Sequence, residues 1–312
     1  MTTTPRGARS GIIALNFDAV ERAIKRVPGL DQAAQRLADQ LQQAILKGGE
    51  RVRGVADALH GTRIGHPLHP ALTDIPIGAW SMAVLFDLIS LVPGTYRMRR
   101  AADMLHVVGV VAAVPTAMAG AADYSGIHRD AAAEALTHAV LNMVGLTAFL
   151  GSLVARTTGH RKLGIGAGVV GLSFVYIPAS LGADLIYRRR VGVDHAHEVP
   201  GETGWFPVAD VADLHEGVVR PVSVGERQLL IGRLSGDIVA MHAVCSHAGG
   251  PLADGEIEGT CVTCPWHYSV FDLRDGAVVH GPATQPQPTY PTRVHNDKIE
   301  VLFGGDQEIS AS

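Results

Sequence analysis

The chain has 312 residues, a length that allows two domains of ordinary size. Hydrophobic residues make up 47% of it and charged residues only 18%, so extensive disorder is excluded. The net charge of −4 gives no basic field that would attract nucleic acid. Three cysteines are too few for a small domain stapled by disulfides, whereas fifteen histidines are many, and this combination favours metal chemistry.

Residues 1–62 are expected to form a soluble helical leader. Apolar residues recur in it at steps of three or four, as in an amphipathic helix, at Leu30, Ala34, Leu37, Leu41 and Ile45. The pattern ends at Gly48-Gly49. We expect this helix to pack on another part of the protein or to lie on a membrane surface. The N-terminal residues lack the apolar run of a secretory signal, so none is predicted.

Four long apolar runs follow, at residues 71–92, 104–122, 138–155 and 163–187. A helix needs about 20 mostly apolar residues to cross a bilayer, and each run is close to that length. Small residues are frequent in the runs and let neighbouring membrane helices approach closely. None of the runs has the polar face that a soluble bundle would show. We therefore predict a four-helix transmembrane domain over residues 63–190.

The pattern changes after the last apolar run. Residues 191–204 are polar and are expected to form a linker. From residue 205, short β-type runs alternate with turn signals such as D-G at 275–276 and N-D at 296–297, as expected for antiparallel strands. The predicted fold class is therefore multi-domain: an α-helical transmembrane bundle followed by an all-β domain at residues 205–305.

The most specific motif lies in the predicted β domain. It consists of C-S-H at 245–247 and C-P-W-H at 264–267, so each of two loops supplies one cysteine and one histidine. Thiolates and imidazoles suit zinc or iron–sulfur chemistry. Zinc sites favour paired cysteines and paired histidines, whereas one of each per loop fits a 2Fe–2S centre in which two histidines replace two cysteines on one iron. Two alternatives are weaker. One is a zinc ion bound by the same four residues, and the other is that the four residues have separate structural roles and bind no metal.

The surrounding residues resemble a known family. The segments C-S-H-A-G-G-P-L and C-P-W-H-Y-S-V-F-D-L-R-D-G, with G-P-A at 281–283, resemble the Rieske ferredoxin-type domain over residues 205–303. This resemblance implies one 2Fe–2S cluster, with two cysteines on the inner iron and two histidines on the outer, solvent-facing iron. The implied ligands are Cys245, Cys264, His247 and His267. The G-P-A turn is implied to shield the cluster.

The sequence departs from the high-potential members of that family. They carry a disulfide between the two cluster loops, at positions that are Gly250 and Trp266 here. They also place a serine and a tyrosine hydroxyl against cluster sulfurs; Ser269 keeps the first as a candidate hydrogen-bond donor, and Phe271 replaces the second. Because hydrogen bonds to the sulfurs stabilise the reduced cluster, we expect a low to intermediate potential. The third cysteine, Cys261, is expected to be a small buried strand residue.

The start of the apolar region resembles a second family. The stretch G-H-P-L-H-P at 65–70 is similar to the opening of an uncharacterised family of bacterial four-helix membrane domains, and the similarity covers about residues 55–190. The resemblance implies a topology and no particular activity.

Ionisable residues inside membrane helices are costly and are therefore candidates for function. If the helices alternate in direction, the end of the bundle from which the β domain emerges gathers His69, His138 and Asp184 as a candidate second site for a quinone, a haem or a metal. The alternative is that these residues only hydrogen-bond between helices. Near the opposite end, Asp87 and His106 are at similar depth and are expected to pair.

The positive charges are nearly balanced between the two ends of the bundle, so they do not settle its orientation. The polar leader favours both termini in the cytoplasm, and the lack of a loop disulfide is compatible with a reducing compartment. We expect a multi-pass protein of a bacterial cell membrane whose Rieske-like domain is cytoplasmic.

These features favour a membrane-tethered 2Fe–2S protein that transfers single electrons. The expected partners are redox donor and acceptor proteins or quinone, with membrane lipid around the bundle and no nucleic acid. The alternative is a membrane oxidoreductase whose bundle holds a second redox site coupled to the cluster. A complete ring-hydroxylating oxygenase is not expected, because such enzymes add a domain with a mononuclear iron and little sequence follows Phe303.

Overall fold

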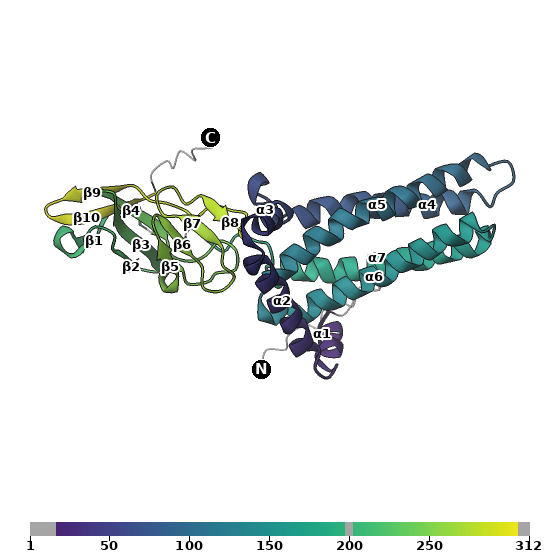
Figure 1. Ribbon diagram of the computed structural model, residues 1–312, viewed down its shortest axis with the longest axis horizontal. Helices are drawn as coiled ribbons and strands as arrows, with labels where there is room; N and C mark the ends of the chain where they lie inside the picture. The colour runs from purple at the N-terminus through teal and green to yellow at the C-terminus, as the bar shows by residue number, and fades with distance from the viewer. Residues whose placement is uncertain (1–16, 197–201, 305–312) are drawn as a thin grey trace, which may run out of the picture.

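The computed structural model describes residues 17–196 and 202–304. Figure 1 shows an elongated molecule with long helices at one end, a β domain at the other, and short N-terminal helices between them. Residues 1–16 of the predicted leader, 197–201 of the predicted linker, and residue 305 lie outside the described residues.

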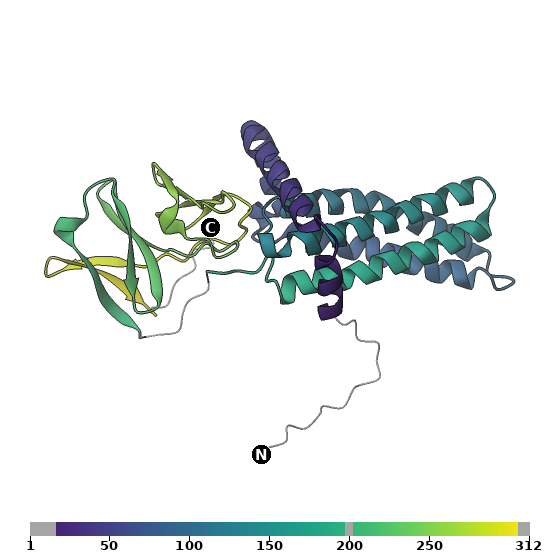
Figure 2. The ribbon, with the colours of Figure 1, turned by 90° about the horizontal axis from the view of Figure 1, so that it is seen from below.

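Four long helices form the bundle: α4 (Leu68–Ile89), α5 (Arg97–Ser125), α6 (Arg129–Thr157) and α7 (Arg161–Tyr187). All four are long and apolar enough to cross a membrane, as predicted. They form two antiparallel hairpins, α4–α5 and α6–α7 (Figure 2). Between the hairpins the Trp80 indole stacks on the Phe149 ring, with centroids 4.2 Å apart.

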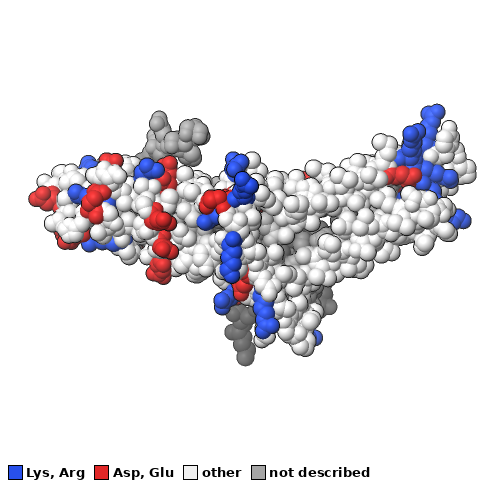
Figure 3. Space-filling model, in the orientation of Figure 1, with Lys and Arg blue, Asp and Glu red and all other residues white. Residues whose placement is uncertain are grey.

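The surface of the bundle has the charge distribution of a membrane-spanning domain. Figure 3 shows a largely uncharged surface along the long helices, between a group of positive charges at the far tip and charges at the end near the β domain. Large apolar side chains such as Leu85, Val111 and Val154 are exposed on it. Such a surface is expected to be covered by lipid.

A buried ion cluster lies toward the far end of the bundle. His106 Nε2 lies 3.1 Å from Asp87 Oδ2, which confirms the predicted pairing. Arg156 and Arg161 each donate to the carboxylates of both Asp87 and Asp103. Because the members neutralise one another and come from all four helices, the cluster has a structural explanation.

The described part of the leader, from residue 17 on, forms three helices rather than the single one that its periodicity predicts: α1 (Phe17–Lys25), α2 (Leu30–Lys47) and α3 (Gly49–His60). The predicted end of the pattern is confirmed, because α2 stops at Lys47. Gly49 has a left-handed backbone (φ 73°) that favours glycine, so the chain turns there and enters α3 at once.

Helix α2 packs on the end of the bundle, one of its two expected locations. Its residues Ala34 and Ala38 are buried in a cluster with Tyr124 of α5 and with the first residues of α6. The Tyr124 hydroxyl donates to the Ala34 carbonyl oxygen at 2.7 Å. The small alanine side chains allow the helices to approach closely.

The β domain consists of three small antiparallel sheets with strand orders β1–β10–β9, β2–β3–β4 and β5–β6–β7–β8. The predicted N-D turn joins β9 to β10, and both of its residues are left-handed (φ 51° and 62°). The strands are β1 (Gly204–Asp210), β2 (Val219–Val224), β3 (Arg227–Leu234), β4 (Asp237–His242), β5 (Glu256–Glu258), β6 (Cys261–Thr263), β7 (Val270–Asp272), β8 (Val278–His280), β9 (Thr292–His295) and β10 (Lys298–Phe303).

Two hydrophobic cores support these sheets. One joins the first sheet to the second through residues such as Ile231 and Val301. The other surrounds Phe271 and includes both Cys245 and Cys264. The two cysteines are therefore fixed by a packed core rather than by a mobile surface loop.

Candidate metal centre

Two loops of the same construction carry the four predicted ligands. Loop 1 follows β4 and contains Cys245 and His247, and loop 2 joins β6 to β7 and contains Cys264 and His267. In each loop the cysteine N–H donates to the carbonyl oxygen five residues later, and the N–H four residues later donates back to the cysteine carbonyl oxygen. The residue that donates back is left-handed in both loops: Gly249 (φ 75°) and Tyr268 (φ 63°).

The four side chains converge between the loops. Cys245 and Cys264 are each 1% exposed, and the rings of His247 and His267 meet edge-on with centroids 5.0 Å apart. The Nδ1 atoms of both histidines are buried and have no hydrogen-bond partner among the described residues. Because buried polar atoms are nearly always paired, two adjacent unpaired nitrogens point to a bound group.

The arrangement suits two metal ions better than one. Within residues 17–196 and 202–304, no three histidine, cysteine, aspartate or glutamate side chains surround a point where a single ion could bind. A zinc ion held by these residues would need all four around one point. Two cysteines in the core and two histidines beside them provide two ligands for each iron of a 2Fe–2S cluster.

Hydrogen bonds and burial set the charge states of these side chains. The hydrogen bond between the two thiols raises the pKa of Cys245 and lowers that of Cys264 to about 7. Backbone N–H groups two and three residues after each cysteine also donate to its sulfur. Burial lowers the pKa of His247 well below 6.5 and that of His267 to about 4. Both imidazoles are therefore neutral, the form that binds metals.

The residues expected to tune the cluster lie beside the cysteines. Ser269 is fully buried, and its Oγ accepts a hydrogen bond from the Ala283 N–H at 3.0 Å, which leaves the Ser269 O–H free to donate. Phe271 is fully buried in the same core as both cysteines. A Cβ at Gly250 would lie 2.8 Å from the Cys264 sulfur, so no side chain fits there. Cys261 lies in β6 but is only partly buried, less than expected.

Phe271→Tyr is expected to raise the reduction potential of the cluster. The new hydroxyl would donate a hydrogen bond that is stronger to the reduced, more negative cluster. A net gain of about 1–1.5 kcal/mol corresponds to roughly 40–60 mV for one electron. A redox titration followed by EPR measures it, with Phe206→Tyr, in β1 and outside this core, as the control. An unchanged or lower potential would show that the ring of residue 271 is not directed at the cluster.

Helix α3 binds the turn at 281–283, which the resemblance implies shields the cluster. The Asp57 carboxylate accepts hydrogen bonds from the Gly281 N–H and from His280 Nδ1, both at 2.9 Å. Just after α3, the Thr62 hydroxyl, in the 3-10 turn Thr62–Ile64, donates to the Ala283 carbonyl oxygen at 3.2 Å. The shielding turn is therefore attached to the helical part of the chain.

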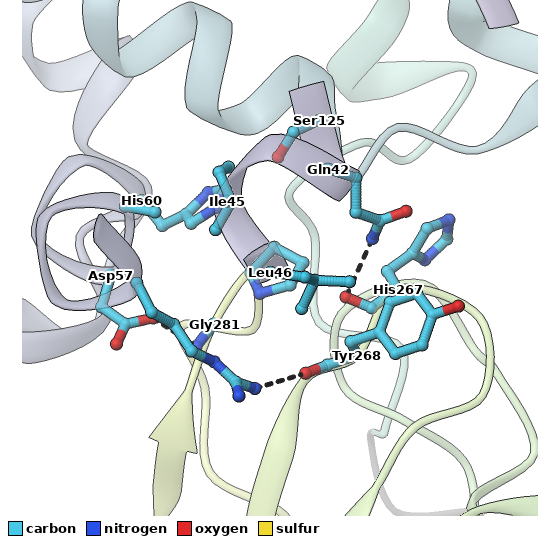
Figure 4. Close-up of a pocket in the computed structure, with 12 residues that line it drawn as sticks. Gln42, Ile45, Leu46, Asp57, His60, Ser125, His267, Tyr268 and Gly281 are labelled. Atoms are coloured by element: carbon cyan, nitrogen blue, oxygen red, sulfur yellow. Dashed lines mark hydrogen bonds between the residues drawn. The ribbon is translucent and has the colours of Figure 1, made fainter. Parts of the chain in front are cut away.

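Loop 2 is bound from the leader as well. Gln42 of α2 donates its side-chain amide to the His267 carbonyl oxygen at 3.1 Å (Figure 4). Arg53 of α3 donates to the Tyr268 carbonyl oxygen at 3.3 Å. Both acceptors are backbone carbonyl oxygens of loop 2, which carries two of the candidate ligands. The leader therefore holds the backbone of this loop in place.

Loop 1 faces the end of the bundle and the linker. A Cβ at Gly126, between α5 and α6, would lie 3.3 Å from Cε1 of His247, and the His195 N–H of the linker donates to the Ser246 carbonyl oxygen at 2.9 Å. His247 and His267 are consequently only partly exposed. The resemblance implies solvent-facing histidines; here the chain's own helices cover part of that surface.

Two pockets in the described part of the chain have His267 in their lining, and the larger of them opens beside Trp266. A pocket of about 360 Å³ has His267 and Trp266 among its lining residues, together with side chains of α2 and of the α5–α6 loop. The His128 ring of that loop lies 5.5 Å from the Trp266 ring and 6.5 Å from the His267 ring, centroid to centroid. The pocket falls in the size range of small-molecule sites, and it reaches a candidate ligand of the outer iron.

The structure brings together two of the three candidate residues in the membrane bundle. The rings of His69 and His138 have centroids 6.3 Å apart. Asp184 is buried and pairs with Arg188 at 3.2 Å rather than with either imidazole. It is two residues beyond Gly182, which contacts His138, and so lies on a different face of α7.

The contacts of the leader with the cluster loops were not predicted from the sequence. Asp57 and Gln42 occur among many polar residues of amphipathic helices, where most such residues are solvated. The only sequence signal is that both lie in the helical leader, which is expected to pack on another part of the protein or on a membrane surface.

A β domain in which two Cys–His loops meet over a common core is the architecture of a 2Fe–2S protein. Residues 204–291 match the family of the Rieske [2Fe-2S] domain, and residues 65–195 match a family described as a predicted membrane protein (DUF2231). The chain belongs to the Rieske family and carries its Rieske domain behind this membrane domain.

The Rieske domain resembles small ferredoxins. The chain is 32% identical over 100 residues to the ferredoxin subunit of anthranilate 1,2-dioxygenase from Burkholderia cepacia, an alignment that covers 32% of this chain and 93% of that protein. It is 31% identical over 97 residues to the ferredoxin component of a naphthalene 1,2-dioxygenase system from Pseudomonas putida, with 31% and 93% covered. The structure of a ferredoxin from Sphingomonas yanoikuyae B1 aligns with 25% identity and a TM-score of 0.30, over 32% of this chain and 99% of that one.

These findings make the chain a membrane-bound Rieske protein with a 2Fe–2S cluster, the chemistry of which is one-electron transfer. Its four apolar helices and the matching membrane family place it in a membrane.

Proposed function

We propose that this protein is a membrane-tethered electron carrier whose cluster is bound by Cys245 and Cys264 on one iron and by His247 and His267 on the other. The observation that supports this assignment most strongly is the pair of buried, unpartnered Nδ1 atoms beside two buried cysteines. When bound, the cluster supplies reversible one-electron chemistry. The protein's own groups hold the imidazoles neutral and donate N–H groups to the cysteine sulfurs.

The hydrogen-bond donors around the cluster also determine its reduction potential. N–H donors and the Ser269 hydroxyl stabilise the reduced cluster, but Phe271 supplies no hydroxyl, so the potential is low to intermediate among Rieske centres. A carrier of this kind accepts electrons from a donor protein and passes them on.

The partners follow from the relatives and from the exposed surface. The matched ferredoxins are named as components of dioxygenase systems, and we propose that redox proteins serve as donor or acceptor here. They approach the pocket beside His267 and Trp266.

The proposed domain organisation has four parts. The leader covers residues 1–62, the lipid-embedded domain residues 63–190, the linker residues 191–204 and the Rieske domain residues 205–305. The Rieske domain lies on the cytoplasmic side of the membrane.

A second candidate function is favoured by the docking of the cluster loops on the bundle. Loop 1 contacts Gly126, the residue after α5, and α5 itself contacts His69 at Gly120, six residues earlier. A second redox group in the bundle, quinone or haem, would then exchange electrons with the cluster inside one chain. The protein would be an oxidoreductase rather than only a carrier.

Spectroscopy of the purified full-length protein tests the proposal. We expect two irons and two acid-labile sulfides per chain and a Rieske-type EPR signal after reduction. One equivalent of zinc without this signal would refute the proposal. Redox titration and turnover with and without added quinol would then separate the two candidates, because a simple carrier is not reduced faster by quinol.

A further inference from the structure

His69 and His138 occupy equivalent positions in the two hairpins of the bundle. His69 Nδ1 lies 2.9 Å from the Thr116 carbonyl oxygen, and His138 Nδ1 lies 2.8 Å from the Pro178 carbonyl oxygen. Four residues after each acceptor is a glycine, Gly120 or Gly182, and the imidazole packs against it. Each hairpin thus presents one histidine from its first helix and fixes it on its second.

The hydrogen bonds determine which ring nitrogen is protonated. A carbonyl oxygen only accepts, so each Nδ1 carries the hydrogen, and in a neutral ring Nε2 keeps its lone pair. For His138 this is independently supported: Asn142 Nδ2 lies 3.0 Å from the His138 carbonyl oxygen and 3.1 Å from its Nε2, so Nε2 accepts a hydrogen bond. Among the described residues, none hydrogen-bonds to Nε2 of His69.

This protonation state favours a metal over a quinone. The carbonyl oxygens of a quinone need hydrogen-bond donors, and an Nε2 with a lone pair is not one. A metal needs a lone pair on nitrogen, and an imidazole whose Nδ1–H is held by a backbone carbonyl is the usual form of a histidine ligand.

The separation of the two rings also fits a shared metal. Two imidazoles that bind one ion from opposite sides have centroids roughly 6 Å apart, because each metal–nitrogen bond is about 2.0–2.1 Å and the ring centre lies about 1 Å beyond. The observed separation is 6.3 Å. No third histidine, cysteine or carboxylate joins the pair in the described part of the chain, so the metal must bring its other ligands with it.

We propose that His69 and His138 are the two axial ligands of a haem bound between the hairpins. A haem provides four ligands in one plane and leaves two axial positions for imidazoles. Its apolar ring suits a membrane bundle, where both histidines are only partly buried although they lie between two hairpins. Asn142 then releases Nε2 and keeps its bond to the backbone of His138.

The location gives this haem a role, which rests on the function proposed above. Gly120, against His69, lies in α5, and Gly126, against His247, directly follows the end of that helix six residues later, a rise of roughly 9 Å. One electron can pass from the reduced cluster to ferric haem, giving oxidised cluster and ferrous haem, without transfer of a proton or breakage of a bond. The haem is thereby the first acceptor or last donor on the membrane side of the cluster.

Haem content of the full-length protein, produced in cells supplied with a haem precursor, tests the proposal. We expect about one haem per chain by the pyridine haemochrome assay, and at least a tenfold loss in H69L and in H138L. The control is H66L, since His66 is exposed and three residues from His69. The H69M variant should keep the haem, with a changed Soret spectrum and a higher haem potential, because a His/Met pair raises it.

The cluster signal separates this inference from the proposed function. In all four variants the Rieske EPR signal should persist and show that the protein is folded. If the purified protein contained haem but no 2Fe–2S cluster, the proposed function would be wrong and the haem site would still be supported. Wild-type protein without haem, equal haem in H69L, H138L and H66L, or a histidine-dependent quinone signal without haem would each overturn the haem site.

Discussion

The variants His247→Ala and His267→Ala are each expected to abolish the Rieske-type EPR signal. Under the proposed ligand assignment, each change would remove one imidazole from the outer iron and leave that iron with a single protein ligand. Their Nδ1 atoms are the unpartnered buried nitrogens of the site, so no neighbouring side chain is placed to substitute for them. We expect a loss of more than tenfold in signal per protein, measured on reduced full-length protein together with iron and sulfide content.

Two neighbouring residues provide matched controls. The His128 ring packs 6.5 Å from His267 but comes from the α5–α6 loop, and His128→Ala should keep the cluster. In the same way Cys264→Ser should lose the cluster, whereas Cys261→Ser, in the same strand segment, should keep it. A full Rieske signal in either histidine variant would show that the ligand assignment is wrong.

The parts of the fold that depend on local composition could be predicted from the sequence. Four apolar runs predicted the four long helices, because crossing a bilayer requires a minimum apolar length. The N-D turn predicted a hairpin, and both of its residues are left-handed as that turn requires. The pairing of Asp87 with His106 could also be predicted, since two polar groups at one depth in a membrane bundle need partners.

The arrangement of the domains could not be predicted in this way. Docking of the β domain depends on a few hydrogen bonds between residues far apart in the chain. Asp57 accepts from the Gly281 N–H and from His280, and Gln42 and Arg53 donate to backbone carbonyl oxygens of loop 2. Such contacts leave no periodicity and no spacing in the sequence. The same is true of Asp184, whose depth matches that of the two histidines but whose helical face does not.

The docked arrangement changes how the cluster meets its partners. Part of the surface around the candidate ligands rests on α2, α3 and the α5–α6 loop. The end of the bundle lies against His247, whereas the larger pocket opens beside Trp266 and His267. Under the function proposed above, a soluble partner would use the pocket side of the cluster and the membrane the His247 side.

The variant Asp57→Ala is expected to loosen this docking. The Asp57 carboxylate binds the Gly281 N–H and His280 Nδ1, and its side chain is 11% exposed, so both hydrogen bonds are largely shielded from water. A hydrogen bond to a charged group contributes about 1.5–3 kcal/mol, and two bonds to one carboxylate are not additive. We therefore expect their joint loss to cost about 2–3 kcal/mol, which lowers the docking equilibrium constant roughly 30- to 150-fold. Hydrogen exchange at residues 280–283 should accelerate by a similar factor.

Accessibility of the cluster provides the second measurement and the control. When the domain undocks, a soluble dysprosium complex can approach His247, and the relaxation of the Rieske EPR signal should become faster than in the wild type. Glu50→Ala is the matched control, because the Glu50 carboxylate lies 4.0 Å from the same His280 ring but is 85% exposed, where an ion pair contributes little. Equal exchange and equal relaxation in the two variants would show that the Asp57 hydrogen bonds do not hold the Rieske domain against the bundle, and that the docking depends on the remaining contacts of α2 and the linker.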